Sequence, residues 1–522
     1  MRKLRLGGYR GLGFLLGALI TVIALVNCGS GSSTSSTSTT STVNTYLSDP
    51  PTCSGGYQHI YVTVTKVTAN ISADASSSDS GWQTLVDLSS APKQVDLMAL
   101  NPSDTPGFCG TLFQLGTEAL PPGKYQQIRL YLLSNTPASG AATPGSNLCQ
   151  NSTGWNCVES QSGAFSELQL PSEVQTGIKI PSSQITSGGL TVSAGESVDF
   201  NIDIDGCSSI VPEGNGQYRL MPVLHAAELS LNGSSTISGK VVEGAGSPNP
   251  GMGVPNATVL LELPNVNVST TPATDQVVLG GVTNSDGTFA FCPVPAVPTG
   301  DAGYDVVVAG TTTQTVTALT TTTYYNPSVV FGVPVGGGTG SIPLFPETTK
   351  AGTATGATIA GQIQTSDGSA AAFAGDVLLS PLMSVTNGST TVSVTVPVLM
   401  DASTPAGSVS DSQPPVYTTL ATPTSSCASA SEDCVAYSIT VPASAAAVGA
   451  YSSSSGNTVA SPSSTDSATY TINGLANGSD SLSTCTSPTG GSASSDAVNV
   501  TPGSSVDQTT DKTLILTLSG CS

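Results

Sequence analysis

Oxygen-bearing side chains recur at alternate positions near residue 200, as Asp199, Asn201, Asp203 and Asp205. Alternate residues of a β-strand share one face, so these four lie opposite Phe200, Ile202 and Ile204. Clustered carboxylates suit a hard cation such as Ca²⁺, which makes Asp199, Asp203 and Asp205 weak metal candidates. Alternate positions are about 6.6–7 Å apart, however, which is long for ligands of one ion, and no EF-hand loop is present. We therefore expect a solvent-facing polar strand face, with no metal and no cofactor.

The two histidines, His59 and His225, are the only general bases available to a Ser-His-Asp triad. Both fall in alternating stretches that predict strands, where a structural histidine is the more common case. The sequence contains no G-x-S-x-G, H-E-x-x-H, P-loop or G-x-G-x-x-G motif. A carboxylate pair for glycoside cleavage stays open, because sequence spacing does not give the separation of two acids in space. We expect a protein that is not an enzyme.

Two tryptophans, Trp82 and Trp155, have side chains that could stack on sugar rings. Trp82 follows a glycine in an alternating stretch and is expected in the core. Trp155 lies between two cysteines close in sequence and is expected to be exposed. Trp155 is therefore the weak ligand candidate.

Ten cysteines follow Cys28. Behind an export signal they should mostly pair. Spacing predicts three bridges, namely Cys149 with Cys157, Cys427 with Cys434, and Cys485 with Cys521. Spacing does not assign the remaining four, Cys53, Cys109, Cys207 and Cys292. The boundaries given below leave five of these cysteines in the first β domain and one in the second, so either a bridge crosses that boundary or each domain has a free thiol.

The N-terminus, residues 1–28, has the layout of a secretory signal. Four basic residues precede a short apolar run, Leu12 to Val26, and the run is short for a spanning helix. Leu25-Val26-Asn27-Cys28 resembles a bacterial lipobox, which implies that Cys28 is lipidated and becomes the mature N-terminus. Asn27 departs from the small residue usual before the cysteine, so an uncleaved single-pass anchor is the alternative. We expect a lipid anchor in the cell envelope, with the outer membrane favoured.

The composition behind the leader predicts an acidic all-β protein. Nine basic and 34 acidic residues remain after Cys28, a net charge of about −25, which argues against nucleic acid as a partner. Ser, Thr, Gly, Ala and Val dominate, which favours short strands over helices. A linker rich in Ser and Thr, residues 29–46, should form a flexible tether.

Alternating patterns from His59 to Val67, Lys93 to Leu100, Tyr125 to Leu133 and Gly195 to Asp205 predict half-buried strands. Six runs follow one another in order along this part of the chain: IYVTVTKV, GWQTLVDLSSAPKQVDLMAL, LPPGKYQQIRLYL, GIKIP, VDFNIDID and GNGQYRLMPVL. Together they resemble the DUF4382 family over residues 47–231. The resemblance implies a β-rich exported domain and does not assign an activity. Residues 134–171 are read as an insertion and the most variable surface.

The next segment, residues 232–350, contains TISGKVV, GVPNATVLLEL, a hairpin at Asp286-Gly287 and YDVVVAG. This order resembles the carboxypeptidase regulatory-like (transthyretin-like) β-sandwich, a module related to carbohydrate-binding folds. Residues 351–522 repeat the pattern weakly, as TIAGQIQTSDG and AGDVLLS, and are read as a second, degenerate sandwich with a Ser/Thr-rich insertion at 401–466. Serial β-sandwiches are therefore the expected architecture.

These observations favour a non-enzymatic, lipid-anchored envelope protein of bacterial type that serves as a surface interaction or structural module. Its expected partners are the membrane, through the lipid, and a glycan or an envelope protein. The alternative is a carbohydrate-binding surface protein that uses the sandwich faces and the 134–171 insertion. A hydrolase with a carboxylate pair is the third hypothesis.

Overall fold

The structure is a computed structural model of the 522-residue chain. It describes residues 41–49, 57–100, 112–150, 154–170, 176–204, 206, 209–212, 218–220, 224–229, 236–267, 273–297, 301–316, 319–347, 357–365, 375–397, 416–419, 434–442, 444–453, 457, 459–460, 468–478, 497–500 and 513–516. The leader with Cys28 lies outside these residues. Within them, no helix is both long enough and apolar enough to cross a membrane.

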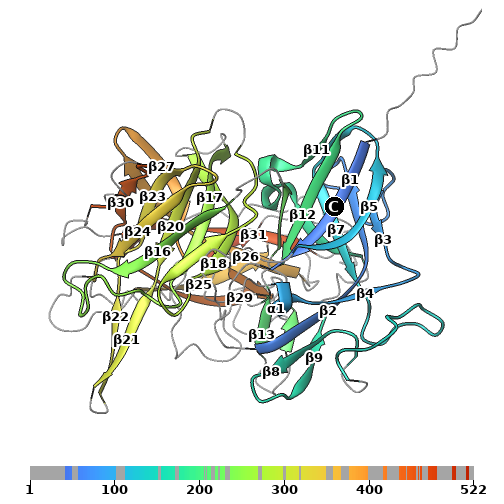
Figure 1. The fold of residues 1–522 in the computed structure, drawn as a ribbon, viewed down its shortest axis with the longest axis horizontal. Helices are drawn as coiled ribbons and strands as arrows, with labels where there is room; N and C mark the ends of the chain where they lie inside the picture. Colours follow the sequence, from blue (N-terminus) through green and yellow to red (C-terminus); the bar gives the residue numbers. More distant parts are fainter. Residues whose placement is uncertain are drawn as a thin grey trace, which may run out of the picture. The chain divides into compact units, whose positions relative to one another are not determined.

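The described chain is almost entirely β-structure, so the predicted all-β class is confirmed (Figure 1). In the first part, up to residue 229, the described residues include a four-residue helix, α1 (Leu97–Leu100), and the 3-10 turns Ser182–Gln184 and Thr186–Gly188. Its strands are β1 (Ser41–Ser48), β2 (Tyr57–Asn70), β3 (Gln83–Asp87), β4 (Lys93–Asp96), β5 (Phe113–Leu120), β6 (Gly123–Tyr125), β7 (Gln127–Leu132), β8 (Cys157–Ser160), β9 (Phe165–Gln169), β10 (Ile178–Pro181), β11 (Leu190–Val192), β12 (Ser197–Ile204), β13 (Ile210–Pro212), β14 (Tyr218–Leu220) and β15 (Leu224–Leu229).

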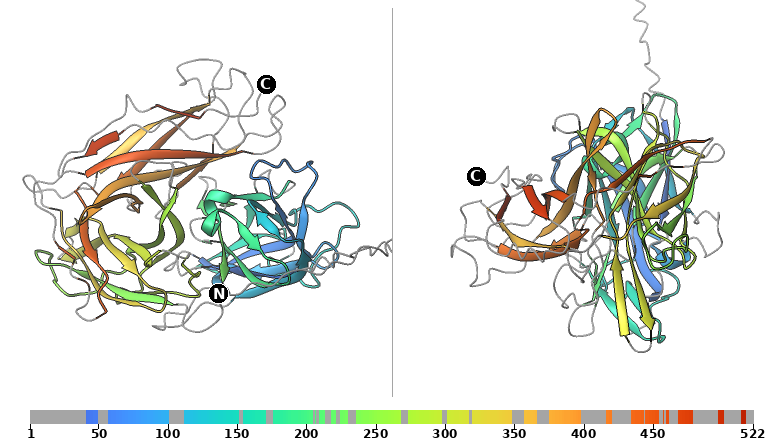
Figure 2. Two further views of the ribbon diagram at one scale, coloured as in Figure 1. Left: turned by 90° about the horizontal axis from the view of Figure 1, so that it is seen from above. Right: turned by 90° about the vertical axis from the view of Figure 1, so that its left-hand side faces the viewer.

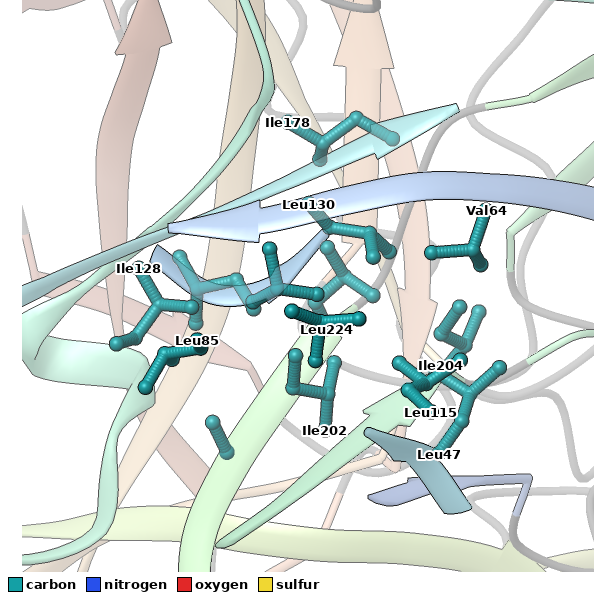
Figure 3. Close-up of a cluster of buried hydrophobic side chains, with 14 of the residues drawn as sticks. Leu47, Val64, Leu85, Leu115, Ile128, Leu130, Ile178, Ile202, Ile204 and Leu224 are labelled. Atoms are coloured by element: carbon teal, nitrogen blue, oxygen red, sulfur yellow. The ribbon is translucent and has the colours of Figure 1, made fainter. Parts of the chain in front are cut away.

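Two sheets enclose the core of this first part. One has the order β15-β12-β1-β5, and the other runs β10-β7-β2-β8-β9-β14-β13 with β3 and β4 beside β2. Apolar residues from both sheets meet between them, including Leu47, Val64, Leu130 and Ile202 (Figure 3). Each fully buried aliphatic side chain of this kind contributes about 1.5–3 kcal/mol, so the alternating strands are held by one shared core.

Strand β2 organises the larger sheet because it is long enough to have two sets of neighbours. Its first half pairs with β4 and β8, and its second half with β3 and β7. Ile60, Val62 and Val64 point into the core. The alternation therefore turns His59, Tyr61 and Thr63 to the opposite face.

Two local expectations were wrong. The linker predicted to extend to residue 46 ends earlier, because β1 begins at Ser41 and lies between β12 and β5, with Val43 and Thr45 buried. The strand predicted from Lys93 to Leu100 stops at Asp96 and turns into α1. The Asp96 carboxylate accepts the Met98 N–H at 3.2 Å, as an N-cap side chain does.

The second part of the chain contains the remaining strands. They are β16 (Ile237–Glu243), β17 (Thr258–Asn267), β18 (Ala273–Val282), β19 (Thr288–Phe291), β20 (Tyr304–Ala309), β21 (Thr311–Val316), β22 (Leu319–Tyr324), β23 (Ser328–Val333), β24 (Gly338–Leu344), β25 (Ala357–Thr365), β26 (Gly375–Asn387), β27 (Thr390–Thr395), β28 (Val416–Thr419), β29 (Cys434–Val441), β30 (Ala447–Ala450), β31 (Ala468–Gly478), β32 (Ala497–Val500) and β33 (Thr513–Leu516).

One sheet joins the strands on either side of residue 350. Its order is β30-β23-β20-β17-β18-β27-β26-β31-β32, with β28 beside β26. Figure 2 draws the strands of this sheet before residue 350 in green to yellow and those after it in orange to red. The joins are parallel: β18 meets β27 through Ala273–Thr274 and Val392–Ser393, and β23 meets β30. Strands from both sides of the boundary predicted near residue 350 therefore pair in one sheet. The division into domains stays a prediction.

Candidate functional site

The candidate site is the outward face of strands β4, β2, β8 and β9, which we call the His59 face. It is defined by His59, Tyr61, Asp96, Glu159 and Phe165. Strand register assembles it: Tyr61 lies opposite Asp96 on one side and Cys157 on the other, His59 lies opposite Glu159, and Glu159 lies opposite Phe165. Residues distant in sequence thus form one patch.

His59 is held between two carboxylates. Its Nδ1 lies 2.6 Å from Asp96 Oδ2 and its Nε2 lies 4.0 Å from Glu159 Oε2, while its ring stacks on Tyr61 at 5.4 Å. The imidazole side chain is 43% exposed and each carboxylate side chain 15%. Burial raises the pKa of Tyr61, and the charges of Asp96 and Glu159 raise it further. The face therefore offers an ordered imidazole and two partly exposed carboxylates to a ligand, with the buried Tyr61 ring stacked on the imidazole.

The same geometry departs from a hydrolytic triad. His59 and Asp96 match its base and orienting acid, but Nε2 faces the Glu159 carboxylate, where a triad has a hydroxyl or thiol. His225 was expected to be a structural histidine, and its surroundings agree with this: the side chain is buried on β15 opposite Asp203. Burial lowers the pKa of His225 to about 4, so its imidazole is neutral at physiological pH.

A disulfide anchors the insertion beside this face. Cys149 and Cys157 are bonded, as predicted, with their Cα atoms 5.7 Å apart. Both are fully buried and pack with Tyr61 and Phe165. Closing so short a loop stabilises the fold by about 2–3 kcal/mol in the chain-entropy account, and it fixes the loop against the His59 face.

Side-chain amides hold the rest of the insertion to the sheet. Asn156 accepts the N–H of Thr63 at 2.8 Å and donates to the Leu133 carbonyl at 2.8 Å. Asn135 accepts the N–H groups of Trp155 and Asn156 at 3.1 and 2.9 Å. The segment predicted as the variable surface is thus bonded to the core strand β2 and shaped by it.

Trp155 is half-buried rather than exposed. The Trp155 carbonyl oxygen accepts two hydrogen bonds, from Thr63 Oγ1 at 2.6 Å and from Gln94 Nε2 at 3.0 Å. These bonds attach the Trp155 backbone to strands β2 and β4. Gly154 precedes it with φ +77°, and a Cβ there would lie 2.7 Å from Asn135. Only glycine fits this approach, and the approach fixes the backbone that leads into Trp155.

We expect Asn156→Ala to destabilise the first part of the chain by about 2–4 kcal/mol, because it leaves buried donors and acceptors unpaired. Tryptophan fluorescence during denaturant unfolding measures this directly, since both tryptophans of the chain lie in this part. Gln161→Ala is the control, because Gln161 is exposed and its Nε2 donates to the Tyr57 carbonyl. Equal losses in the two variants would contradict the role given to Asn156.

The polar row of β12 is only partly as predicted. Phe200, Ile202 and Ile204 do lie in the core, but the opposite face is not solvent-facing. Asn201 and Asp203 are only 5% and 3% exposed, and Asp199 is half-buried. The expectation failed because alternation shows which residues share a face, and burial depends on what covers it.

The parallel neighbour β1 supplies hydrogen bonds to this row. Asn44 Nδ2 donates to Asp199 Oδ1 at 2.9 Å, and Ser48 Oγ donates to Asp203 Oδ1 at 2.5 Å. Asn201 Nδ2 donates to Ser48 Oγ at 2.7 Å. Among the described residues no group of three or more His, Cys, Asp or Glu side chains is placed to hold a metal ion. Asp205 lies outside the described residues.

Cys292 is disulfide-bonded, which removes the free thiol considered for the second predicted domain. Its partner is not among the residues whose side chains are described. Cys434 begins β29, and its predicted bridge stays a prediction. The other predicted or unassigned cysteines, Cys53, Cys109, Cys207, Cys427, Cys485 and Cys521, lie outside the described residues, as does the lipidation candidate Cys28.

Five acidic residues of the described second part are buried, and none of them was expected to be: Glu243, Glu262, Asp275, Asp305 and Glu347. The available signal was an acid inside an otherwise apolar strand, as in VLLEL and YDVVV. His59 was noted in the sequence, but its grouping with Asp96 and Glu159 depends on pairing between distant strands.

Residues 40–222 match the model of a family described as Domain of unknown function (DUF4382). The resemblance seen in the sequence is therefore confirmed over most of its predicted extent, and the His59 face lies within the matched region. The family description assigns no activity. No curated protein matches the sequence.

Several solved structures are similar at a low level. Three of them are a variant of BcpA, the major pilin subunit of Bacillus cereus (9% identity, 58% of this chain and 69% of that one, TM-score 0.16), the Bacillus anthracis TIE protein (7%, 93% and 51%, 0.12), and GBS52, the minor pilin in the Gram-positive pathogen Streptococcus agalactiae (11%, 55% and 96%, 0.14). These TM-scores are too low to support an argument about fold or function.

Proposed function

We propose that this protein is a non-enzymatic, lipid-anchored component of the cell envelope whose DUF4382 region presents the His59 face to a binding partner. The observation that carries the proposal is the preorganisation of that face. A disulfide and a set of buried amides fix the insertion beside an imidazole already positioned by Asp96. A rigid surface loses less conformational entropy on binding, which favours recognition.

The anchoring part of the proposal rests on the leader and on the oxidised cysteines. A disulfide between Cys149 and Cys157, and a second one that includes Cys292, suit an oxidising compartment outside the cytoplasm. The Cys28→Ser variant tests the lipid. We expect wild-type protein in the detergent-soluble membrane fraction and the variant in the soluble fraction. A variant that stays in the membrane would favour the uncleaved anchor instead.

The binding role is tested by in-cell crosslinking of the full chain, followed by identification of crosslinked envelope components. We expect one component to be captured by wild-type protein and lost at least tenfold with His59→Ala and with Glu159→Gln. Glu118→Gln, an exposed acid on β5, is the control for the loss of a negative charge. Capture that is equal for all four proteins would exclude the His59 face as the contact surface.

A glycan is the second candidate partner, and the half-buried Trp155 with its hydrogen-bonded backbone favours it. An aromatic ring together with polar groups provides both stacking and hydrogen bonding to a sugar. Glycan-array binding by the full chain should fall at least tenfold with Trp155→Ala and persist with Glu118→Gln. If no glycan binds wild-type protein, the partner is of another class.

A further inference from the structure

Three carboxylates are buried together in the second part of the chain. Glu262 on β17 is fully buried, and Asp275 on β18 and Asp305 on β20 are each only 3% exposed. Glu262 lies directly opposite Asp305 in the antiparallel pair of β17 and β20. Leu261 and Leu263 point into the core, so Glu262 occupies the other, equally buried face of this sheet.

Two of these carboxylates accept backbone N–H groups where the sheet is irregular. Asp305 Oδ1 accepts the Gly332 N–H at 2.9 Å, at a register shift between β20 and β23 where Gly332 has φ +71°. Glu262 Oε2 accepts the Thr395 N–H at 3.0 Å. Thr395 lies two residues beyond the last paired residue of β27 with β18. Glu262 therefore bonds a strand before residue 350 to a strand after it.

The charges around Glu262 are all of one sign. Asp275 faces it from β18 and Asp305 from β20, while β23 and β27 contribute the neutral N–H groups of Gly332 and Thr395. No basic side chain of the described residues contributes to the electrostatics of Glu262 or Asp305. Asp275 also interacts with Asp305 and acts against the rise in its pKa.

We propose that Glu262 and Asp305, buried beside Asp275, form a proton-binding latch that fastens the β18–β27 join in acid and loosens it as the pH rises. When Glu262 and Asp305 are protonated, the cluster carries less negative charge and its hydrogen bonds persist. When they ionise, like charges repel one another inside a region that excludes water. The part of the sheet that depends on the Glu262 contact to Thr395 then opens more often.

The direction of the effect follows from the pKa values. Burial raises the pKa of Glu262 well above its usual range, with repulsion from Asp275 and Asp305 added. Burial raises the pKa of Asp305 to about 6, although the Gly332 N–H and Asp275 act against this rise. A group whose pKa is raised in the folded state stabilises the fold fully below its ordinary pKa, near 4, and this stability is lost as the pH rises toward the folded-state pKa. The contribution of Asp305 is thus lost between about pH 4 and 6. The loss of the Glu262 contribution continues to higher pH, because the pKa of Glu262 is raised further.

Hydrogen exchange of the full mature chain between pH 5 and 8 tests the latch. Protection factors corrected for intrinsic exchange should fall for the β17, β18 and β27 amides by up to about tenfold per pH unit for each proton released. Glu262→Gln retains an acceptor for the Thr395 N–H but cannot ionise. This variant should therefore flatten the profile and protect these amides better than wild type at pH 8. Glu118→Gln should keep the wild-type profile.

A wild-type profile that is flat or rises with pH would overturn the proposal, as would a Glu262→Gln variant with the wild-type slope. Infrared titration of the wild-type chain supplies a second measurement that needs no variant. A carboxyl C=O band of protonated acid should persist above pH 6, and its absence there would also overturn the proposal.

Discussion

Replacing Arg129 with alanine is expected to lower the free energy of unfolding of the first part of the chain by about 3–5 kcal/mol. Arg129 lies on β7 and is only 2% exposed. Its Nη1 donates to the Thr176 carbonyl at 2.8 Å, its Nη2 donates to the Ala75 carbonyl at 3.1 Å, and its guanidinium lies 5.0 Å from the ring centre of Trp82. Truncation leaves a cavity and two carbonyls without these donors, which explains the size of the expected loss.

The measurement is denaturant unfolding followed by tryptophan fluorescence, with Trp82 itself as a probe of the site. Arg129→Lys should lose less stability than Arg129→Ala, because lysine keeps the charge and most of the side-chain length. It should still lose some, because lysine lacks the planar guanidinium fork that reaches both carbonyls. Lys66→Ala is the surface control, because the Lys66 ammonium lies 5.6 Å from the Tyr131 ring centre in a cation–π contact and should cost under about 1 kcal/mol. An Arg129→Ala loss as small as that of Lys66→Ala would show that the buried contacts contribute little.

Gly253→Ala is expected to have the second large effect, a loss of about 3 kcal/mol in the second part of the chain. A Cβ at residue 253 would lie 1.8 Å from the Asp286 carbonyl oxygen and 2.3 Å from its carbonyl carbon. Backbone atoms cannot turn away as a side chain can. They belong to the Asp286-Gly287 turn that precedes β19, so the hairpin must shift away from the loop that contains residue 253.

Hydrogen exchange in β16 measures the effect, since the Val254 N–H donates to the Val241 carbonyl at 3.0 Å and β16 pairs with β19. Gly251→Ala is the matched control two residues away, where φ is +88° but nothing lies within 4 Å of the added carbon. It should cost about 1 kcal/mol of backbone strain. Equal loss of β16 protection in both variants would assign the effect to strain and not to the contact with Asp286.

The Asp286-Gly287 hairpin also shows how much a local pattern can predict. An Asp-Gly pair between two alternating segments indicates a tight turn by itself, and the structure has that turn with Gly287 at φ +85°. The same holds for β12, whose alternating residues marked the strand in the sequence. The runs GIKIP and YDVVVAG likewise coincide with β10 and β20. The Cys149–Cys157 bridge was equally accessible, because two cysteines eight residues apart need no tertiary information to be near one another.

The predictions from sequence were wrong where the burial of a residue depends on strands that are distant in the chain. The stretch from Ser41 looked like the end of a tether because it has few apolar residues, yet β1 is central in its sheet, parallel to β12. That pairing also gives Asn201 and Asp203 their polar neighbours. Trp155 was expected outside, and it is half-buried because Thr63 and Gln94, far away in sequence, bond its carbonyl.

By itself the sequence determined the all-β class, the acidic charge, the likeness of residues 47–231 to the DUF4382 family and one disulfide, since each follows from composition or short-range spacing. Only the tertiary structure decided the His59 face and the Glu262 cluster. Both depend on strand register between segments tens of residues apart or more, and a one-residue change in register would turn these side chains to the opposite face of their sheets.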